Sequence, residues 1–283
     1  MTTESTDFSH TDLPSQNKRV FRLGVAGNFG LGTDDCHYAA DRGVNFWLWT
    51  PTFKKVTPAL REILARDREQ HVVSMLDMAV TAGMARRGVH KALKLLETDY
   101  LDCYELGWLG RTSWLTDSIS EQLLRLKDEG KIRSIGTSIH DRKRAGQLAR
   151  DSILDTFMIR YSAKHPGAEQ DIFPHVGKRN PTIISYTTTS WQQLLRPVKG
   201  IDMPPWPGSK RLSPPPPPLT AGLCYRFSLS SPHVHVVLTG PKTRAQLDDN
   251  LAAVQAGPLS PEEDEWVRRY GRLVKDKKRL PYL

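Results

Sequence analysis

Short apolar segments alternate with amphipathic segments along the chain. Eight of the apolar segments are six to eight residues long and rich in β-branched and aromatic residues, which is typical of strands. They are VFRLGVA, VNFWLW, HVVSML, YLDCYEL, IRSIGTS, DTFMIR, PTIISYT and HVHVVLTG. The intervening segments, such as residues 57–68 and 118–130, have the apolar spacing of amphipathic helices. This pattern predicts a (β/α)8 barrel, whose active site lies at the carboxyl ends of the strands.

Two segments interrupt the alternation. Residues 1–18 are polar and lack an apolar core, so they predict a disordered N-terminal tail and not a secretory signal. Residues 188–218 contain PPWPGSKRLSPPPPP, which predicts a proline-rich loop with extended backbone. The loop is either a surface excursion without a role or a contact for a protein partner. Residues 19–283 are expected to form a single domain.

A further helix is expected after the barrel, which we place at residues 20 to about 257. Residues 260–275 begin with Ser260 and Glu263, the spacing of a capping box, and Pro261 suits the first helical turn. The fold prediction is therefore a (β/α)8 barrel with an added C-terminal helix.

Composition narrows the class of protein. The chain has 283 residues, of which 39% are hydrophobic and 25% charged, as in a soluble globular protein. No apolar stretch approaches the length of a membrane span. The net charge of +9 comes from dispersed basic residues, which disfavours nucleic-acid binding and suits a small anionic ligand such as a phosphorylated cofactor. Three cysteines without CxxC spacing favour a reduced, cytoplasmic setting, and no metal site is predicted.

Several segments resemble the aldo-keto reductase superfamily. LKDEGKIRSIGTS and LSSPHVHVVLTGPKTRAQLDDNLAAV carry the resemblance, and RGVNF and TDYLDCYEL occur in the expected order. It covers about residues 20–275. The resemblance implies an NADP(H)-dependent (β/α)8 barrel that reduces carbonyl groups with a tetrad of Asp, Tyr, Lys and His.

The four tetrad positions carry other residues in this chain. The Asp and Tyr positions fall on Leu48 and Phe53, the Lys position on Met75 or Leu76, and the His position on Gly107. Hydride addition to a carbonyl needs a proton donor or fixed dipole at the developing oxyanion. Because none of these side chains supplies one, the sequence disfavours conventional carbonyl reduction.

The resemblance also implies a nucleotide site. The segment after the eighth strand opens a helix, whose N-terminal amides favour an anion. The family pattern assigns the 2′-phosphate and adenine contacts there to Lys242, Thr243, Arg244, Gln246, Asp249 and Asn250. At the nicotinamide end it retains Ser138 and the stacking residue Tyr186, whereas Ile139 and Met158 replace an Asn and a Gln. The alternatives are a capped surface helix with solvated charges and a tyrosine used only for packing.

The remaining candidates follow strand ends. Trp49, Phe53, Trp108 and Trp114 predict a substrate pocket for a flat or apolar ligand, although the tryptophans alternatively pack loops together. Arg160 is assigned to the same pocket as a contact for an acidic substrate, and it is alternatively solvated. Glu105 lies two residues before Gly107 and should point into the barrel. It is either a general acid with a raised pKa or a buried glutamate paired with an arginine.

Three functional hypotheses follow. The first is an aldo-keto-reductase-like protein that binds NADP(H) and a small aromatic or apolar molecule without standard carbonyl reduction. The second is a non-catalytic cofactor sensor or assembly partner. The third is a non-redox enzyme with a rebuilt apolar pocket and no nucleotide.

Overall fold

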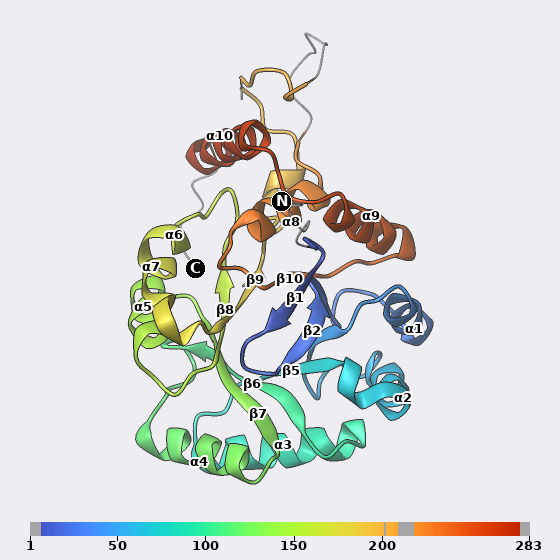
Figure 1. Ribbon diagram of the computed structural model, residues 1–283, viewed down its shortest axis with the longest axis vertical. Coiled ribbons are helices and arrows are strands. Elements are labelled where there is room, and N and C mark those ends of the chain that lie inside the picture. Colours follow the sequence, from blue (N-terminus) through green and yellow to red (C-terminus); the bar gives the residue numbers. More distant parts are fainter. Residues whose placement is uncertain (1–6, 201, 209–217, 278–283) are drawn as a thin grey trace, which may run out of the picture.

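Eight parallel strands close into a barrel in the computed structural model, which describes residues 7–200, 202–208 and 218–277 (Figure 1). Each strand pairs with the next one along the chain, and the last pairs with the first. The strands are β3 (Leu23–Ala26), β4 (Phe46–Trp49), β5 (Val72–Asp77), β6 (Leu101–Leu109), β7 (Ile132–Ile139), β8 (Thr156–Arg160), β9 (Thr182–Tyr186) and β10 (Val236–Thr239). The predicted barrel is confirmed.

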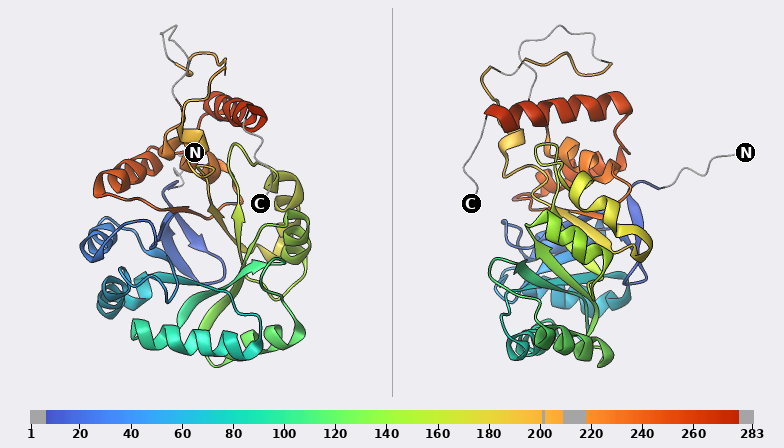
Figure 2. Two further views of the ribbon diagram at one scale, coloured as in Figure 1. Left: turned by 180° about the vertical axis from the view of Figure 1, so that it is seen from behind. Right: turned by 90° about the vertical axis from the view of Figure 1, so that its left-hand side faces the viewer.

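Helices surround the barrel and cover the outer face of its strands (Figures 1 and 2). Threonine or aspartate side chains cap several of them by accepting a backbone N–H of the first turn. The helices are α1 (Thr33–Asp41), α2 (Thr57–Asp67), α3 (Ala82–Leu96), α4 (Asp117–Asp128), α5 (Arg142–Arg150), α6 (Ala168–Asp171), α7 (Phe173–Val176), α8 (Ala221–Ser230), α9 (Arg244–Gln255) and α10 (Pro261–Lys277).

The pleat of the strands separates two apolar cores. On β4, Phe46 and Leu48 pack with the cluster inside the barrel, whereas Trp47 and Trp49 pack with the cluster between the strands and the helices. This is the two-residue alternation of a strand. Each strand therefore presents alternate residues to the interior, and only these line the barrel mouth.

A hairpin closes the amino-terminal end of the barrel, where β1 (His10–Leu13) pairs with β2 (Lys18–Phe21) (Figure 1). Leu13 and Val20 pack with the interior cluster, and buried Gln16 donates to Ser134 Oγ at 2.6 Å. The predicted disordered tail is therefore wrong for residues 7–18, while residues 1–6 lie outside the described residues. The prediction relied on the polar composition of this segment. The hairpin, however, buries few apolar side chains, and polar side chains such as Gln16 hydrogen-bond to the barrel.

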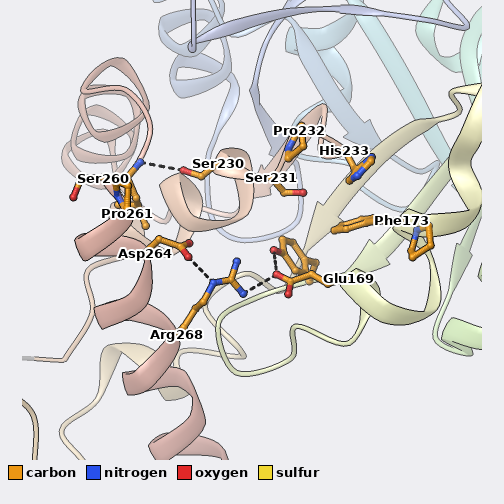
Figure 3. Close-up of a pocket in the computed structure, with 13 residues that line it drawn as sticks. Glu169, Phe173, Ser230, Ser231, Pro232, His233, Ser260, Pro261, Asp264 and Arg268 are labelled. Atoms are coloured by element: carbon orange, nitrogen blue, oxygen red, sulfur yellow. Dashed lines mark hydrogen bonds and ion pairs between the residues drawn. The ribbon is translucent and has the colours of Figure 1, made fainter.

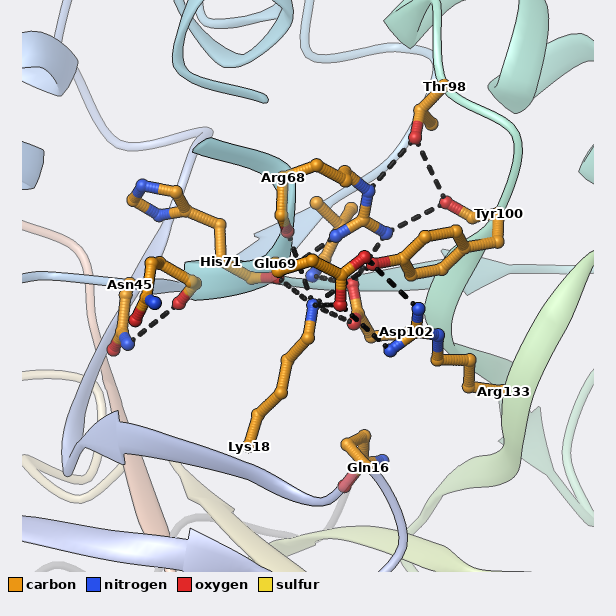
Figure 4. Close-up of polar contacts among 12 residues, drawn as sticks. Gln16, Lys18, Asn45, Arg68, Glu69, His71, Thr98, Tyr100, Asp102 and Arg133 are labelled. Carbon is orange, nitrogen blue, oxygen red and sulfur yellow. Dashed lines mark hydrogen bonds and ion pairs between the residues drawn. The ribbon is translucent and has the colours of Figure 1, made fainter. Parts of the chain in front are cut away.

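A buried charge network holds the hairpin (Figure 4). Lys18 Nζ lies 2.8 Å from Asp102 Oδ1, and Arg68 Nη2 lies 2.8 Å from Asp102 Oδ2. The carboxylate of Asp102 is fully buried and also accepts the backbone N–H of Val73 at 2.9 Å. Two cations and an amide thus compensate one buried anion at the base of the barrel.

The added C-terminal helix is confirmed as α10. Ser260 Oγ accepts the backbone N–H of Glu263, and Glu263 Oε2 accepts the backbone N–H of Ser260. The described part of the proline-rich loop packs on this helix, since Trp266 Nε1 donates to the carbonyl of Pro204 at 2.9 Å and its ring lies 5.1 Å from Trp206. Residues 209–217, which hold most of the proline run, lie outside the described residues.

Replacing Asp102 by asparagine should strongly destabilise the protein, because it removes the nearer counter-charge of the buried Lys18 ammonium, whose other carboxylate, that of Glu69, lies 4.0 Å away. Breaking a buried ion pair in this way typically costs about 3–5 kcal/mol. Urea unfolding of the Asp102→Asn variant measures the loss. The matched control is Asp12→Asn in the same hairpin, where the carboxylate is 78% exposed and pairs with Arg19. An equally small decrease in the free energy of unfolding of both variants would contradict this expectation.

Candidate functional site

The inward positions at the barrel mouth are largely apolar. Leu48 and Leu76 pack on the interior cluster from the ends of β4 and β5. At Gly107 a Cβ atom would lie 2.8 Å from the carbonyl oxygen of Asp77, so this position has no room for a side chain. Met75 is fully buried in the outer core. Between the two residues considered for the lysine position, the inward one is therefore Leu76, and the choice of Met75 is wrong.

Trp49 does not line the mouth, so its assignment to a ligand pocket is wrong. The side chain is fully buried in the outer core, and its Nε1 donates to Thr57 Oγ1 at 3.1 Å. The reason is the strand alternation, because a strand that turns Leu48 inward must turn its neighbour outward.

The other predicted aromatic residues lie at or beyond the carboxyl ends of the strands. Trp108 is 43% exposed near the end of β6, and Trp114 is 56% exposed on the segment between β6 and α4. Phe53 is partly buried against the outer core, and a Cβ atom on Gly27 would lie 3.3 Å from its Cδ2. Exposed Met78 precedes α3 in the neighbouring loop. Apolar side chains thus surround the mouth in this sector.

Glu105 points into the barrel as predicted, but it has no arginine partner among the described residues. Its Oε1 accepts from Thr156 Oγ1 at 3.1 Å, Cys103 Sγ at 3.1 Å and Ser74 Oγ at 3.4 Å. Its Oε2 is buried and has no hydrogen-bond partner there. Burial raises the pKa of this carboxyl, which favours the protonated form. The side chain is fully buried below Gly107, so it does not reach the mouth.

Ser138 and Tyr186 come together at the ends of β7 and β9. Tyr186 Oη lies 3.0 Å from His140 Nδ1, with the two rings edge to face. Burial raises the pKa of Tyr186 to about 12, although the Ser138 hydroxyl and Arg160 act in the opposite direction. Burial, together with Arg160 and Arg111, lowers the pKa of His140. The imidazole is therefore neutral at pH 7.

The start of α9 lies beside α1. Thr243 caps α9 by accepting the backbone N–H of Gln246 at 3.3 Å, and Gln246 Oε1 accepts the backbone N–H of Lys242 at 2.8 Å. Arg244 Nε donates to Asp35 Oδ1 at 2.7 Å. This guanidinium, assigned to a 2′-phosphate by the sequence, is held by a carboxylate of the protein.

The two remaining residues of this set lie on the body of α9. Asp249 is exposed. Asn250 is buried, and its Nδ2 donates to Thr239 Oγ1 at 3.1 Å. Its amide thus joins α9 to β10.

A basic cavity of about 550 Å³ opens at the ends of β7 and β8. Arg160, which the sequence singled out, contributes to it and lies 5.5 Å from the ring of exposed Trp191. The other lining residues are Arg111, His140, Asp141, Arg142, Lys143 and Asp171. Sequence reasoning did not select Arg111, Arg142 or Lys143, although each lies within a few residues of a strand end.

A second cavity, of about 640 Å³, lies on the flank between α6, α7 and α10 (Figure 3). Its charged groups satisfy one another. Arg268 pairs with both Glu169 and Asp264, and Tyr161 Oη donates to Glu169 at 2.6 Å. These contacts attach α10 to the barrel, and each of these three charged side chains has its partner within the protein.

The part of the chain that the structure describes contains no cluster of three or more His, Cys, Asp or Glu side chains arranged to hold a metal ion. None of its helices is long and apolar enough to cross a membrane.

Comparison with known proteins assigns the family. The model of the aldo/keto reductase family matches residues 32–205, more than half of the chain, so this protein belongs to that family. The fold is similar to an aldo-keto reductase from Bacillus halodurans in its holo form, with a TM-score of 0.76, 18% identity and coverage of 93% of this chain and 96% of that one. It is also similar to a glycerol dehydrogenase from Gluconobacter oxydans, with a TM-score of 0.72, 17% identity and coverage of 98% and 99%. Comparison with curated proteins gave no match.

Replacing Glu105 by glutamine should stabilise the protein increasingly as pH rises. Because folding raises the pKa of this carboxyl, its protonated form contributes stability that is present below the unfolded pKa and lost as pH rises through the folded pKa. The glutamine side chain of the variant does not titrate, so the stability of the variant does not fall in this way as pH rises. We expect near equality at pH 5 and an advantage of about 1–3 kcal/mol for the variant at pH 8, the cost of an unsatisfied buried polar group.

Urea unfolding of both proteins at the two pH values measures this difference. Glu121→Gln on the exposed face of α4 is the control, with a carboxylate that is 64% exposed. A constant difference between Glu105→Gln and the wild type across this range would show that the carboxyl titrates normally.

Proposed function

We propose that this protein binds a nicotinamide nucleotide and a small aromatic or apolar ligand, and that it does not carry out standard carbonyl reduction. The observation that supports this proposal is the set of inward residues at the mouth, Leu48, Leu76 and Gly107. On the family pattern these stand at three of the four tetrad positions, and Phe53 stands at the fourth.

The physical argument concerns the oxyanion that forms when a hydride adds to a carbonyl. A phenol donates the proton in the family pattern, and a lysine, a histidine and a carboxylate support it. Phe53 has the ring without the hydroxyl, and Leu48 and Leu76 stabilise no charge. The replacements agree with one another, because a buried lysine left without its carboxylate would be costly.

A second candidate is catalysis with Tyr186 as the proton donor. Its contact with His140 at 3.0 Å places a phenol and an imidazole together at the mouth. A pKa of about 12 makes this phenol a poor acid at pH 7, so we rank this candidate below the first. Full burial below the mouth also disfavours Glu105 as a donor.

Members of the family generally bind NAD(P)H, and we propose that this chain prefers NADP(H). The start of α9 offers backbone N–H groups to an anion, and Lys242 and Arg244 lie beside it. Arg244 already pairs with Asp35, so a 2′-phosphate would replace that carboxylate on the guanidinium. Arg244 would therefore have an anionic partner both in the free protein, where it is Asp35, and in the complex, where it would be the 2′-phosphate.

Replacing Arg244 by alanine should weaken NADPH binding about tenfold or more and leave NADH binding unchanged. A charged hydrogen bond to the 2′-phosphate is worth on the order of 1–3 kcal/mol. Titration of the intrinsic tryptophan fluorescence with each nucleotide measures both affinities. Arg66→Ala is the control, because this exposed arginine of α2 also pairs with an aspartate of α1, Asp41. Equal affinity of the wild type for the two nucleotides would remove the proposed preference.

Purified protein should show no useful NADPH-dependent reduction of nitrobenzaldehyde. The tetrad positions carry no proton donor and the Tyr186 phenol is a poor acid at pH 7, so turnover should stay far below about 1 per second, the lower end of the usual enzymatic range. Nicotinamide absorbance follows the reaction in the wild type and in Phe53→Tyr, which restores one phenol. Wild-type turnover in the usual range would contradict the proposal, and its loss in Tyr186→Phe would then identify the donor.

A further inference from the structure

The basic cavity at the ends of β7 and β8 carries an excess of positive charge. Four cationic side chains line it, Arg111, Arg142, Lys143 and Arg160, against the two carboxylates of Asp141 and Asp171. With His140 neutral, two positive charges remain uncompensated. The excess is local, because these groups come from the segment after β6, the end of β7 with the start of α5, and the end of β8 with α6.

Both carboxylates already have partners in the protein. Asp171 Oδ2 accepts from Arg142 Nε at 2.7 Å. Asp141 caps α5, with its Oδ1 accepting the backbone N–H of Arg144 at 3.1 Å. Asp171 is thus held by Arg142, and Asp141 is held by the first turn of α5.

Three cations remain without a carboxylate within 4.0 Å in the described part of the chain, namely Arg111, Lys143 and Arg160. Arg160 is partly buried, and its guanidinium lies 5.5 Å from the ring of Trp191. Like charges that converge on one cavity repel each other, and a bound anion would relieve this repulsion. Most other arginines of this protein meet a carboxylate, as Arg68 and Arg142 do.

We propose that this cavity binds a small dianion and that a phosphate monoester is its class of ligand. The uncompensated charge matches a dianion, and two guanidinium groups supply the paired donors that phosphate oxygens accept. The N-terminus of α5, which opens at Arg142, adds backbone N–H groups of the same polarity. A volume of about 550 Å³ suits a small molecule.

The position of the cavity indicates where the rest of the ligand lies. His140 lines the cavity and contacts Tyr186 at the mouth. Trp191 is 57% exposed beside Arg160 and offers an aromatic face. An aromatic phosphate monoester could place its phosphate in the cavity and its ring against Trp191. The inference goes beyond nucleotide binding, because it uses none of the residues assigned to the 2′-phosphate.

Isothermal titration of the nucleotide-free protein with phenyl phosphate tests the proposal, with inorganic phosphate and neutral phenol as comparison probes. We expect saturable binding of phenyl phosphate, weaker binding of inorganic phosphate and none of phenol. Arg160→Gln, Arg111→Gln and Lys143→Gln should each weaken phenyl phosphate about tenfold. Arg111 and Lys143 are exposed, so these two variants are expected to fold as the wild type does. Arg125→Gln, on the exposed face of α4, should change affinity less than twofold.

The result that overturns the proposal is the absence of phenyl phosphate binding, or an equal loss in Arg125→Gln and the cavity variants. A second arm titrates Arg160→Gln with NADPH and should find wild-type affinity. If NADPH and phenyl phosphate weaken by the same factor, the cavity belongs to the nucleotide and the proposal is wrong. If the wild type binds phenyl phosphate and no nucleotide, this proposal stands and the nucleotide proposal fails.

Discussion

The two-residue pleat of a strand inside a closed barrel is the constraint on which the rest of this structure depends. Once Phe46 faces the interior, Leu48 must face it too, and Trp47 and Trp49 must face the helices. The same rule carries Leu76 and not Met75 to the mouth. The register of each strand therefore decides which of its residues line the mouth. A shift of one residue in a strand would turn its inward residues toward the helices and its outward residues toward the interior.

Charge is distributed along the barrel axis in three distinct ways. At the amino-terminal end, Asp102 is buried with two cations, which joins the hairpin to the strands. In the middle, Glu105 is buried with hydroxyl and thiol donors and no cation among the described residues, and burial raises the pKa of its carboxyl. At the carboxyl end, cations exceed carboxylates around Arg160. The buried carboxylate with cationic partners thus lies at the amino-terminal end, and the excess of cations lies at the carboxyl end.

Much of the fold could be predicted from the sequence, because strand and helix periods and the Ser260–Glu263 capping box are local signals. The hairpin was missed because its role depends on contacts with distant residues, such as that of Lys18 with Asp102. Trp49 was assigned to the mouth because it lies at a strand end. The position along the strand does not show whether a side chain faces the interior or the helices, which depends on the pleat. The basic cavity was recognised only in part, since Arg111 and Lys143 look like ordinary surface charges until three loops bring them together.

The central claim is that the mouth binds an aromatic ligand beside a nucleotide without transferring a proton. The most direct measurement mixes NADPH-loaded protein with an excess of nitrobenzaldehyde in a stopped-flow instrument and follows protein fluorescence and nicotinamide absorbance together. The account predicts a saturable fluorescence change at constant absorbance. Stoichiometric oxidation of the bound NADPH within the first turnover would contradict it.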